Sequence, residues 1–191
     1  MKFLMAALIS ASLAAQLVPA QSRQAGVRSR IPAAEYAIYS AVIGKMFPGD
    51  KASSDSQSKD EFFVIVDRTV KNHFATMVGR DEGKIVKQEF SSIISQETID
   101  DYVAKNAKSY RLTKSFNLRL EYVLSAKDES GFSNLVGSIA LSRVGFDSSG
   151  NQALVYMRDY CGPLCGTGRY ILLVKNGKQW IVQKTFTAWV S

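Results

Sequence analysis

GRYILLVKNGKQWIVQKTFTAW, residues 168–189, contains two strand-like segments joined at Asn176-Gly177. An Asn-Gly pair is the strongest short signal for a β-hairpin, because both residues accept positive φ angles. The segments on either side, 168–175 and 179–189, are rich in the β-branched and aromatic residues that favour strands. This stretch therefore predicts an antiparallel hairpin.

Two further strand-like segments precede the hairpin, GSIALSRVGF at 137–146 and NQALVYMRDY at 151–160. They are joined to each other by Asp-Ser-Ser-Gly at 147–150, and to the hairpin by the loop 161–167. Short links of this kind force neighbouring strands to run antiparallel. The C-terminal third therefore predicts a four-stranded antiparallel meander.

Upstream, two segments have helical patterns. Residues 33–47 carry apolar side chains at helical spacing, and 95–108 begin with a plausible Ser95 cap followed by acidic residues. Residues 62–66, FFVIV, and 118–124 have the composition of strands. We expect one α+β domain over residues 32–191, with two main helices packed on one face of an antiparallel sheet. By analogy, the sheet would curve around a helix, as in cystatin-like or nuclear-transport-factor-like folds.

The first 20 residues have the order of an export signal. Lys2 precedes an apolar stretch that reaches about Val18, and Val18-Pro19-Ala20 supplies the small residues of a cleavage site. We expect residues 1–20 to be a signal peptide and residues 21–31, which hold three arginines, to be a flexible basic arm. The chain is then expected to be exported, to the periplasm or outside the cell.

Basic residues outnumber acidic ones, 24 to 17, for a formal net charge of +7. Such a charge is more commonly a solubilising surface, and contact with an anionic envelope surface is the alternative. Because an exported protein rarely meets nucleic acid, we expect no nucleic-acid partner. The physiological partner is not indicated by the sequence.

The two cysteines, Cys161 and Cys165, are predicted to form a structural disulfide, since an even number of cysteines in an exported chain indicates pairing. The alternative is a thiol–disulfide oxidoreductase, because Cys-Gly-Pro-Leu-Cys is one residue longer than the thioredoxin-type motif. That chemistry needs the first cysteine at a helix N-terminus, whereas strand-like sequence surrounds this pair. Two cysteines and one histidine are too few for a metal centre, so no metal or cofactor is expected.

Neighbouring carboxylates occur at Asp81/Glu82, Asp100/Asp101 and Asp128/Glu129. Adjacent side chains on a helix or strand point apart, and each pair lies in a turn or at a helix start, where solvated acids are common. We therefore predict no catalytic residue. A carboxylate-based hydrolase stays an alternative, to be tested by whether two carboxylates face one pocket.

Four aromatic residues of the meander are candidates for ligand contact: Tyr156, Tyr160, Tyr170 and Trp180. Aromatic side chains on an exposed sheet face can bind glycans or peptides. Aromatic residues at strand spacing also commonly belong to the core.

The C-terminal third resembles an uncharacterised group of exported bacterial proteins. The resemblance rests on LSRVGF at 141–146, QALVY at 152–156, CGPLCGTG at 161–168, Tyr170 with Leu172-Leu173, Gly177-Lys178 with Trp180, and WVS at 189–191, with weaker echoes at 67–69 and Asn106. It implies an exported bacterial module and no assigned activity. Together these observations predict a non-enzymatic exported binding or accessory module.

Overall fold

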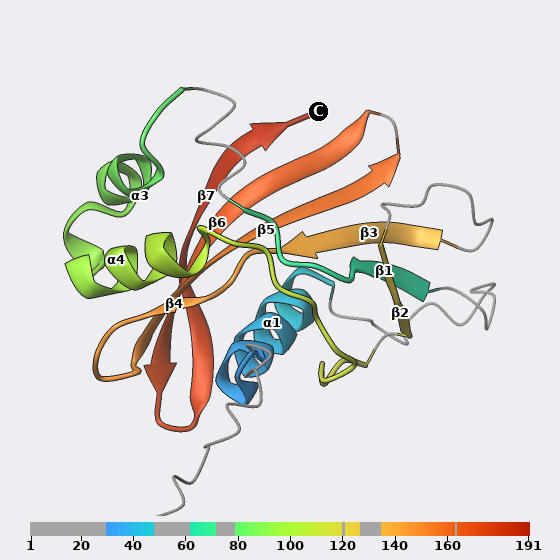
Figure 1. Ribbon diagram of the computed structural model, residues 1–191, viewed down its shortest axis with the longest axis horizontal. Coiled ribbons are helices and arrows are strands. Elements are labelled where there is room, and N and C mark those ends of the chain that lie inside the picture. The colour runs from blue at the N-terminus through green and yellow to red at the C-terminus, as the bar shows by residue number, and fades with distance from the viewer. Residues whose placement is uncertain (1–29, 48–61, 72–78, 120, 127–134, 163) are drawn as a thin grey trace, which may run out of the picture.

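The computed structural model describes residues 30–47, 62–71, 79–119, 121–126, 135–162 and 164–191. Its helices are α1 (Ala33–Met46), α3 (Glu82–Phe90) and α4 (Gln96–Lys105), with a 3₁₀ turn, η1 (Ser91–Ile93), between the last two. Its strands are β1 (Phe62–Val66), β2 (Tyr122–Ser125), β3 (Leu135–Leu141), β4 (Gly145–Phe146), β5 (Gln152–Gly162), β6 (Cys165–Asn176) and β7 (Gln179–Val190). The fold class is α+β, as predicted (Figure 1).

All seven described strands belong to one sheet in the order β2-β1-β3-β5-β6-β7, with β4 paired to β5. The pairs β3–β5, β5–β6 and β6–β7 are antiparallel, whereas β1 pairs in parallel with both β2 and β3. The expectation of an antiparallel sheet is therefore wrong for the N-terminal strands. Long connections separate β1 from both of its neighbours, and such connections permit the parallel pairing that a short link forbids.

The segment 137–146 is not the single strand that was expected. β3 ends at Leu141, and the short β4 begins at Gly145, so the chain leaves the ladder at Ser142–Val144. The break accommodates a buried ion pair, because the Arg143 side chain points into the protein there and pairs with Glu35 of α1. The Val144 backbone N–H also donates a hydrogen bond to Glu35 Oε2, with a donor–acceptor distance of 3.0 Å.

The helices cover opposite faces of the sheet, contrary to the expected one-sided packing. On β5, Ala153, Val155 and Met157 pack in the core with α1. The alternate residues Leu154 and Tyr156 pack in a second core with α3 and α4. Successive strand residues point to opposite faces, so the continuous apolar run at 153–157 must be covered on both sides.

Helices α1 and α4 lie within the ranges predicted from sequence, and Ser95 caps α4 by accepting a hydrogen bond from the Thr98 N–H. α3 is an additional helix, which the helical patterns described above did not include. Asp81 caps it by accepting from the Lys84 N–H. The helix has only 9 residues and carries Gly83 in its first turn. Its apolar residues are therefore too few to show a helical period in the sequence.

The predicted signal peptide, 1–20, and residues 21–29 of the predicted arm lie outside the described residues. Arg30 is exposed, and Ile31 is buried in the core beneath α1. Within the described part of the chain, no helix has the length and apolar character needed to cross a membrane.

Candidate functional site

The four aromatic candidates do not form one site, because Trp180 lies on the other face of the sheet from Tyr156 and Tyr170. Tyr156 and Tyr170 are a cross-strand pair on the face covered by α3 and α4, with ring centroids 4.9 Å apart. Tyr160 lies farther along β5 and packs against the Trp189 ring, with ring centroids 5.6 Å apart. Trp180 belongs to the opposite face, where it packs with the α1 core.

Tyr170 donates a hydrogen bond to a buried carboxylate, that of Glu82. Its hydroxyl donates to Glu82 Oε1 at 2.7 Å, and the Tyr102 hydroxyl donates to the same oxygen at 3.2 Å. Glu82 is only 5% exposed, and its Oε2 has no hydrogen-bond partner among the described residues. Burial raises the pKa of Glu82, and the two tyrosine hydroxyls offset part of that rise. The cluster joins α3 and α4 to the sheet and leaves Tyr170 inaccessible to a ligand.

Tyr156 and Tyr160 take part in a second packing arrangement, over the glycines of β6. The Trp189 indole donates to the Tyr156 hydroxyl at 2.8 Å. A Cβ at Gly166 would meet the Tyr160 ring at 2.7 Å, and one at Gly168 would overlap both Trp189 and the Tyr156 hydroxyl. The two glycines that follow the second cysteine, Gly166 and Gly168, therefore leave room for aromatic rings to pack directly against the backbone of β6.

Cys161 and Cys165 form the predicted disulfide, which closes the end of the β5–β6 hairpin. Both cysteines are exposed and are flanked by strands. The helix N-terminus that lowers a thiol pKa in thioredoxin-type enzymes is not part of this hairpin. The arrangement is that of a staple across a loop.

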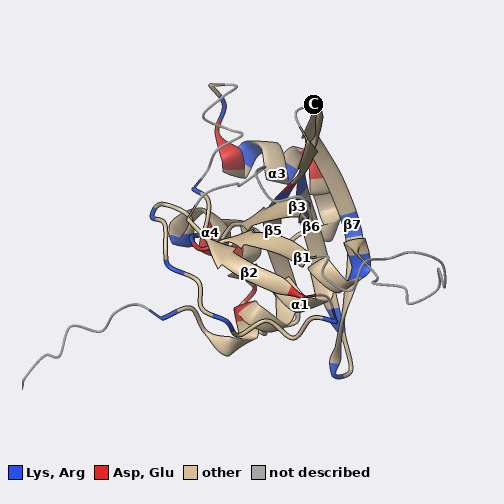
Figure 2. Cartoon of the chain, turned by 90° about the vertical axis from the view of Figure 1, so that its right-hand side faces the viewer, with Lys and Arg blue, Asp and Glu red and all other residues tan. Residues whose placement is uncertain are grey.

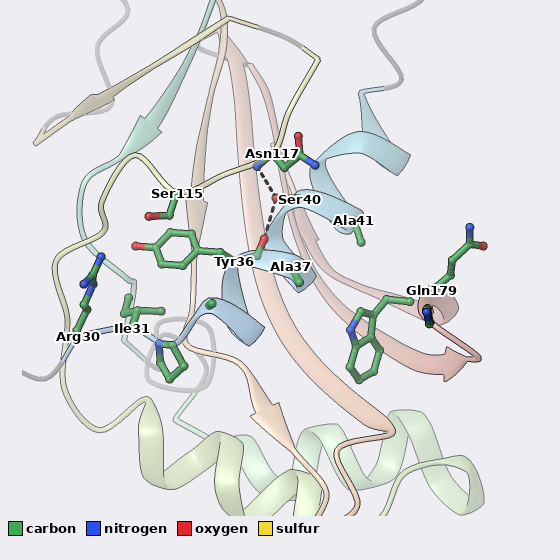
Figure 3. Close-up of a pocket in the computed structure, with 13 residues that line it drawn as sticks. Arg30, Ile31, Tyr36, Ala37, Ser40, Ala41, Ser115, Asn117 and Gln179 are labelled. Carbon is green, nitrogen blue, oxygen red and sulfur yellow. Dashed lines mark hydrogen bonds between the residues drawn. The ribbon is translucent and has the colours of Figure 1, made fainter.

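Trp180 lines a groove of about 880 Å³. The groove is lined by side chains from three segments, within residues 30–41, 115–117 and 178–180. Figure 3 shows Ala37 and Ala41 of α1 between Tyr36 on one side and Gln179 on the other. The small alanine side chains lower the helix surface here and so create the groove.

Hydrogen bonds hold one wall of the groove in place. Ser40 Oγ donates to the Tyr36 carbonyl at 2.8 Å and accepts from the Asn117 N–H at 2.9 Å (Figure 3). The Tyr36 hydroxyl accepts from the Thr113 N–H at 2.8 Å. On the opposite wall, the Trp180 ring packs against Phe146, with centroids 6.0 Å apart, and beneath the Lys175 ammonium at 5.7 Å.

The charged side chains that line the groove are all positive. Its charged lining residues are Arg30 and Lys178, and none of the described lining residues is acidic. Figure 2 shows basic residues at the described start of the chain and at the tip of the β6–β7 hairpin. Neither Arg30 nor Lys178 forms an ion pair with another described residue. The acid in the first turn of α1, Glu35, is buried against Arg143 instead.

A second hollow, of about 470 Å³, lies between α3 and α4 and is lined by Asp81 and Asp100. This is the two-carboxylate arrangement that the hydrolase alternative requires. Both aspartates are exposed, however, and each is engaged locally: Asp81 caps α3, and Asp100 accepts from Gln96 at 2.9 Å. Lys84 and Lys87 line the same hollow. These are solvated surface acids beside cations, which do not make an acid–base pair.

Neither a family model, nor a curated protein, nor a solved structure matches this chain. The resemblance to a group of exported bacterial proteins stays a prediction. Among the described residues, no group of three His, Cys, Asp or Glu side chains is placed to hold a metal ion.

Sequence reasoning missed the two buried acids, Glu35 and Glu82. The signal for Glu35 was available, because it lies one helical turn before Tyr39 on the apolar face of α1. An acid on such a face requires a buried partner. The partner, Arg143, could not be identified from spacing, since 108 residues separate the two.

Proposed function

We propose that this chain is an exported binding module whose ligand occupies the groove between α1 and the β6–β7 hairpin. The observation that carries the proposal is a half-buried tryptophan, Trp180, in the wall of a hollow of about 880 Å³. Binding sites for small ligands are typically hollows of roughly 300–1,000 Å³ with apolar walls and a few polar groups.

The groove offers both kinds of contact. Trp180, Pro32 and Ala37 supply apolar surface. The side chains of Asn117 and Gln179 supply amide donors and acceptors. Because Trp180 is already oriented by Phe146 and Lys175, little side-chain entropy would be lost when a ligand packs against the indole.

Export is part of the same proposal. The disulfide between Cys161 and Cys165 supports it, because such bonds persist in oxidising compartments. The signal-like residues 1–20 and the resemblance to exported proteins agree with it.

The test uses the two tryptophans of the chain. In a Trp189→Phe background, Trp180 is the sole indole, so its fluorescence reports directly on the groove. We would titrate this protein with maltohexaose, an alginate hexasaccharide, hexaglutamate and citrate. At least one probe should change the fluorescence saturably.

Variants in the otherwise native chain locate the binding by calorimetry. Trp180→Ala should weaken it at least tenfold. The control is Ile181→Ala, which removes a neighbouring side chain that is 44% exposed and does not line the groove. The proposal fails if none of the four probes binds, or if Trp180→Ala leaves the affinity of every bound probe unchanged.

A further inference from the structure

We infer that the ligand of this groove is an extended acidic oligosaccharide, an inference that rests on the proposed function. The residues that line the groove are spread across α1. Figure 3 shows Arg30 and Ile31 at one end and Gln179 at the other, with Ala37 of α1 between them. A ligand that fills it crosses the helix.

The cations stand at the two ends of this path. Arg30 is at one end, and Lys178, the neighbour of Gln179, lines the other. A single carboxylate could approach only one of them. A chain with an acidic group on successive units could contact both at once, and each contact would restrict the other end, which raises the effective concentration there.

The start of α1 adds to the positive field. Pro32 is the N-cap residue and provides no side-chain hydrogen bond to the first-turn amides. The first-turn residue Ala33 lines the groove at this end. Partial positive charge at a helix N-terminus favours anions, and here it acts beside a full cation, Arg30.

The neutral lining favours sugar rings over a peptide. Rings with one apolar face can stack on the Trp180 indole, and their hydroxyls can bond to the amides of Asn117 and Gln179. A peptide would need main-chain partners or side-chain pockets. On the inner wall, however, the Asn117 N–H is already bound by Ser40, and the Ser115 N–H by the Thr113 carbonyl.

The ligand could be a free oligosaccharide or a segment of an acidic envelope polymer. The chemistry is the same, and the two sources differ in length. Calorimetry on the full-length mature protein would compare glucuronate, an alginate hexasaccharide and long-chain alginate. Free oligosaccharide binding predicts equal affinity per site for the hexasaccharide and the polymer, whereas a polymer ligand predicts tighter binding of the long chain.

Specificity would be measured at low and high salt against maltohexaose, a neutral chain of matched length, and hexaglutamate, an acidic peptide of matched length. The hexauronate should bind at least tenfold more tightly than maltohexaose, glucuronate or hexaglutamate. The difference from maltohexaose should shrink at high salt, since screening weakens exposed ion pairs.

Arg30→Gln and Lys178→Gln should each weaken hexauronate binding about two- to fivefold, the worth of an exposed ion pair, and the double variant about tenfold. Lys45→Gln, on the same helix outside the groove, is the matched control and should have no effect. None of these variants should change the affinity for maltohexaose.

If maltohexaose and hexauronate bind equally and both lose affinity in Trp180→Ala, the ligand is not acidic, but the proposal of a binding module stands.

If hexaglutamate binds more tightly than the hexauronate, the ligand is an acidic peptide and not a sugar. If glucuronate binds as tightly as the hexauronate, the ligand is not an extended chain. If none of these probes binds, the inference fails; a response to citrate that is lost in Trp180→Ala would still uphold the binding module.

Discussion

Glu35 of α1 and Arg143, in the break between β3 and β4, form an ion pair inside the protein, with Nη2 and Oε1 2.6 Å apart. The side chain of Glu35 is 0% exposed and that of Arg143 is 7% exposed. Arg143 Nε also donates to Oε2 at 2.8 Å, which makes the pair bidentate, and its guanidinium stacks on the Tyr110 ring at 4.5 Å. The pair links the first helix to the point where the chain leaves the sheet.

Removing one member of this pair should be far more costly than removing both. Glu35→Ala would leave the Arg143 charge buried without its partner, and we expect a loss of about 3–5 kcal/mol in the free energy of unfolding. Urea denaturation of the wild type and the variant would measure this loss of unfolding free energy. The double variant Glu35→Leu/Arg143→Met should regain much of the loss, because it leaves no buried charge.

The control for that experiment is the pair Arg111–Asp67, in which the Arg111 side chain is 77% exposed and the Asp67 side chain 14% exposed. Arg111→Ala should cost less than about 1 kcal/mol, since the Arg111 charge is solvated and a pair with a solvated member contributes little. A loss of similar size for Glu35→Ala and Arg111→Ala would contradict the structural role of the buried pair.

Glu82→Gln should change how stability depends on pH. Burial raises the pKa of Glu82 above its ordinary value of 4.5, so the folded protein holds this proton more tightly than the unfolded chain does. The folded state is therefore favoured at low pH and loses stability as the pH rises from 4.5 through the raised pKa. Glutamine can still accept the hydroxyls of Tyr170 and Tyr102 and does not titrate.

The measurement is the unfolding free energy of both proteins across this pH range. The wild type should lose stability relative to Glu82→Gln as the pH rises, and the difference should level off once Glu82 is ionised in the folded state. Two parallel pH profiles would contradict a raised pKa.

Gly168→Ala should destabilise the protein by roughly 1–3 kcal/mol, as overpacking does, because the added methyl group overlaps Trp189 and the Tyr156 hydroxyl. Gly44→Ala is the matched substitution in open space. Gly44 lies inside α1, where an added Cβ would have nothing within 4 Å, and alanine should stabilise the helix by about 0.5–1 kcal/mol. Thermal unfolding should therefore shift in opposite directions for the two variants, and a shift in the same direction would contradict the seating of the rings on β6.

Replacing both cysteines, Cys161→Ser/Cys165→Ser, should lower the unfolding free energy by about 2 kcal/mol, the chain-entropy value for so small a ring. The groove is formed elsewhere, so ligand affinity should not change. The wild type should not catalyse insulin reduction by dithiothreitol. Turnover in that assay that is lost in the double variant would instead favour the thiol–disulfide oxidoreductase.

Several residues that carry the resemblance to exported bacterial proteins have structural roles. Arg143 of LSRVGF lies in the buried break. Gly145 begins β4 directly after the break, and a Cβ there would meet the Thr98 carbonyl at 2.6 Å. Asn106 accepts from the Arg143 N–H at 2.8 Å and donates to its carbonyl at 3.1 Å. Gly168 seats aromatic rings. Lys178 and Trp180 of the same pattern line the groove instead.

The sequence alone determined what depends on near neighbours along the chain. The Asn-Gly turn and the short links predicted where β5, β6 and β7 pair, and Ser95 marked the start of α4. The even number of cysteines in a chain expected to be exported indicated the disulfide between Cys161 and Cys165. Each of these is a local signal, because turn conformation, helix capping and a short covalent ring involve residues within a few positions of one another.

Only the tertiary structure decided what depends on distant residues. Periodicity says that a side chain is apolar but does not say which element covers it, so the two-sided sheet and the separation of Trp180 from Tyr156 and Tyr170 were not predicted. The partner of Glu35 and the walls of the groove come from segments far apart in sequence. Their meeting is set by the packing of whole elements, and that is why the α+β class could be predicted from the sequence while the candidate site could not.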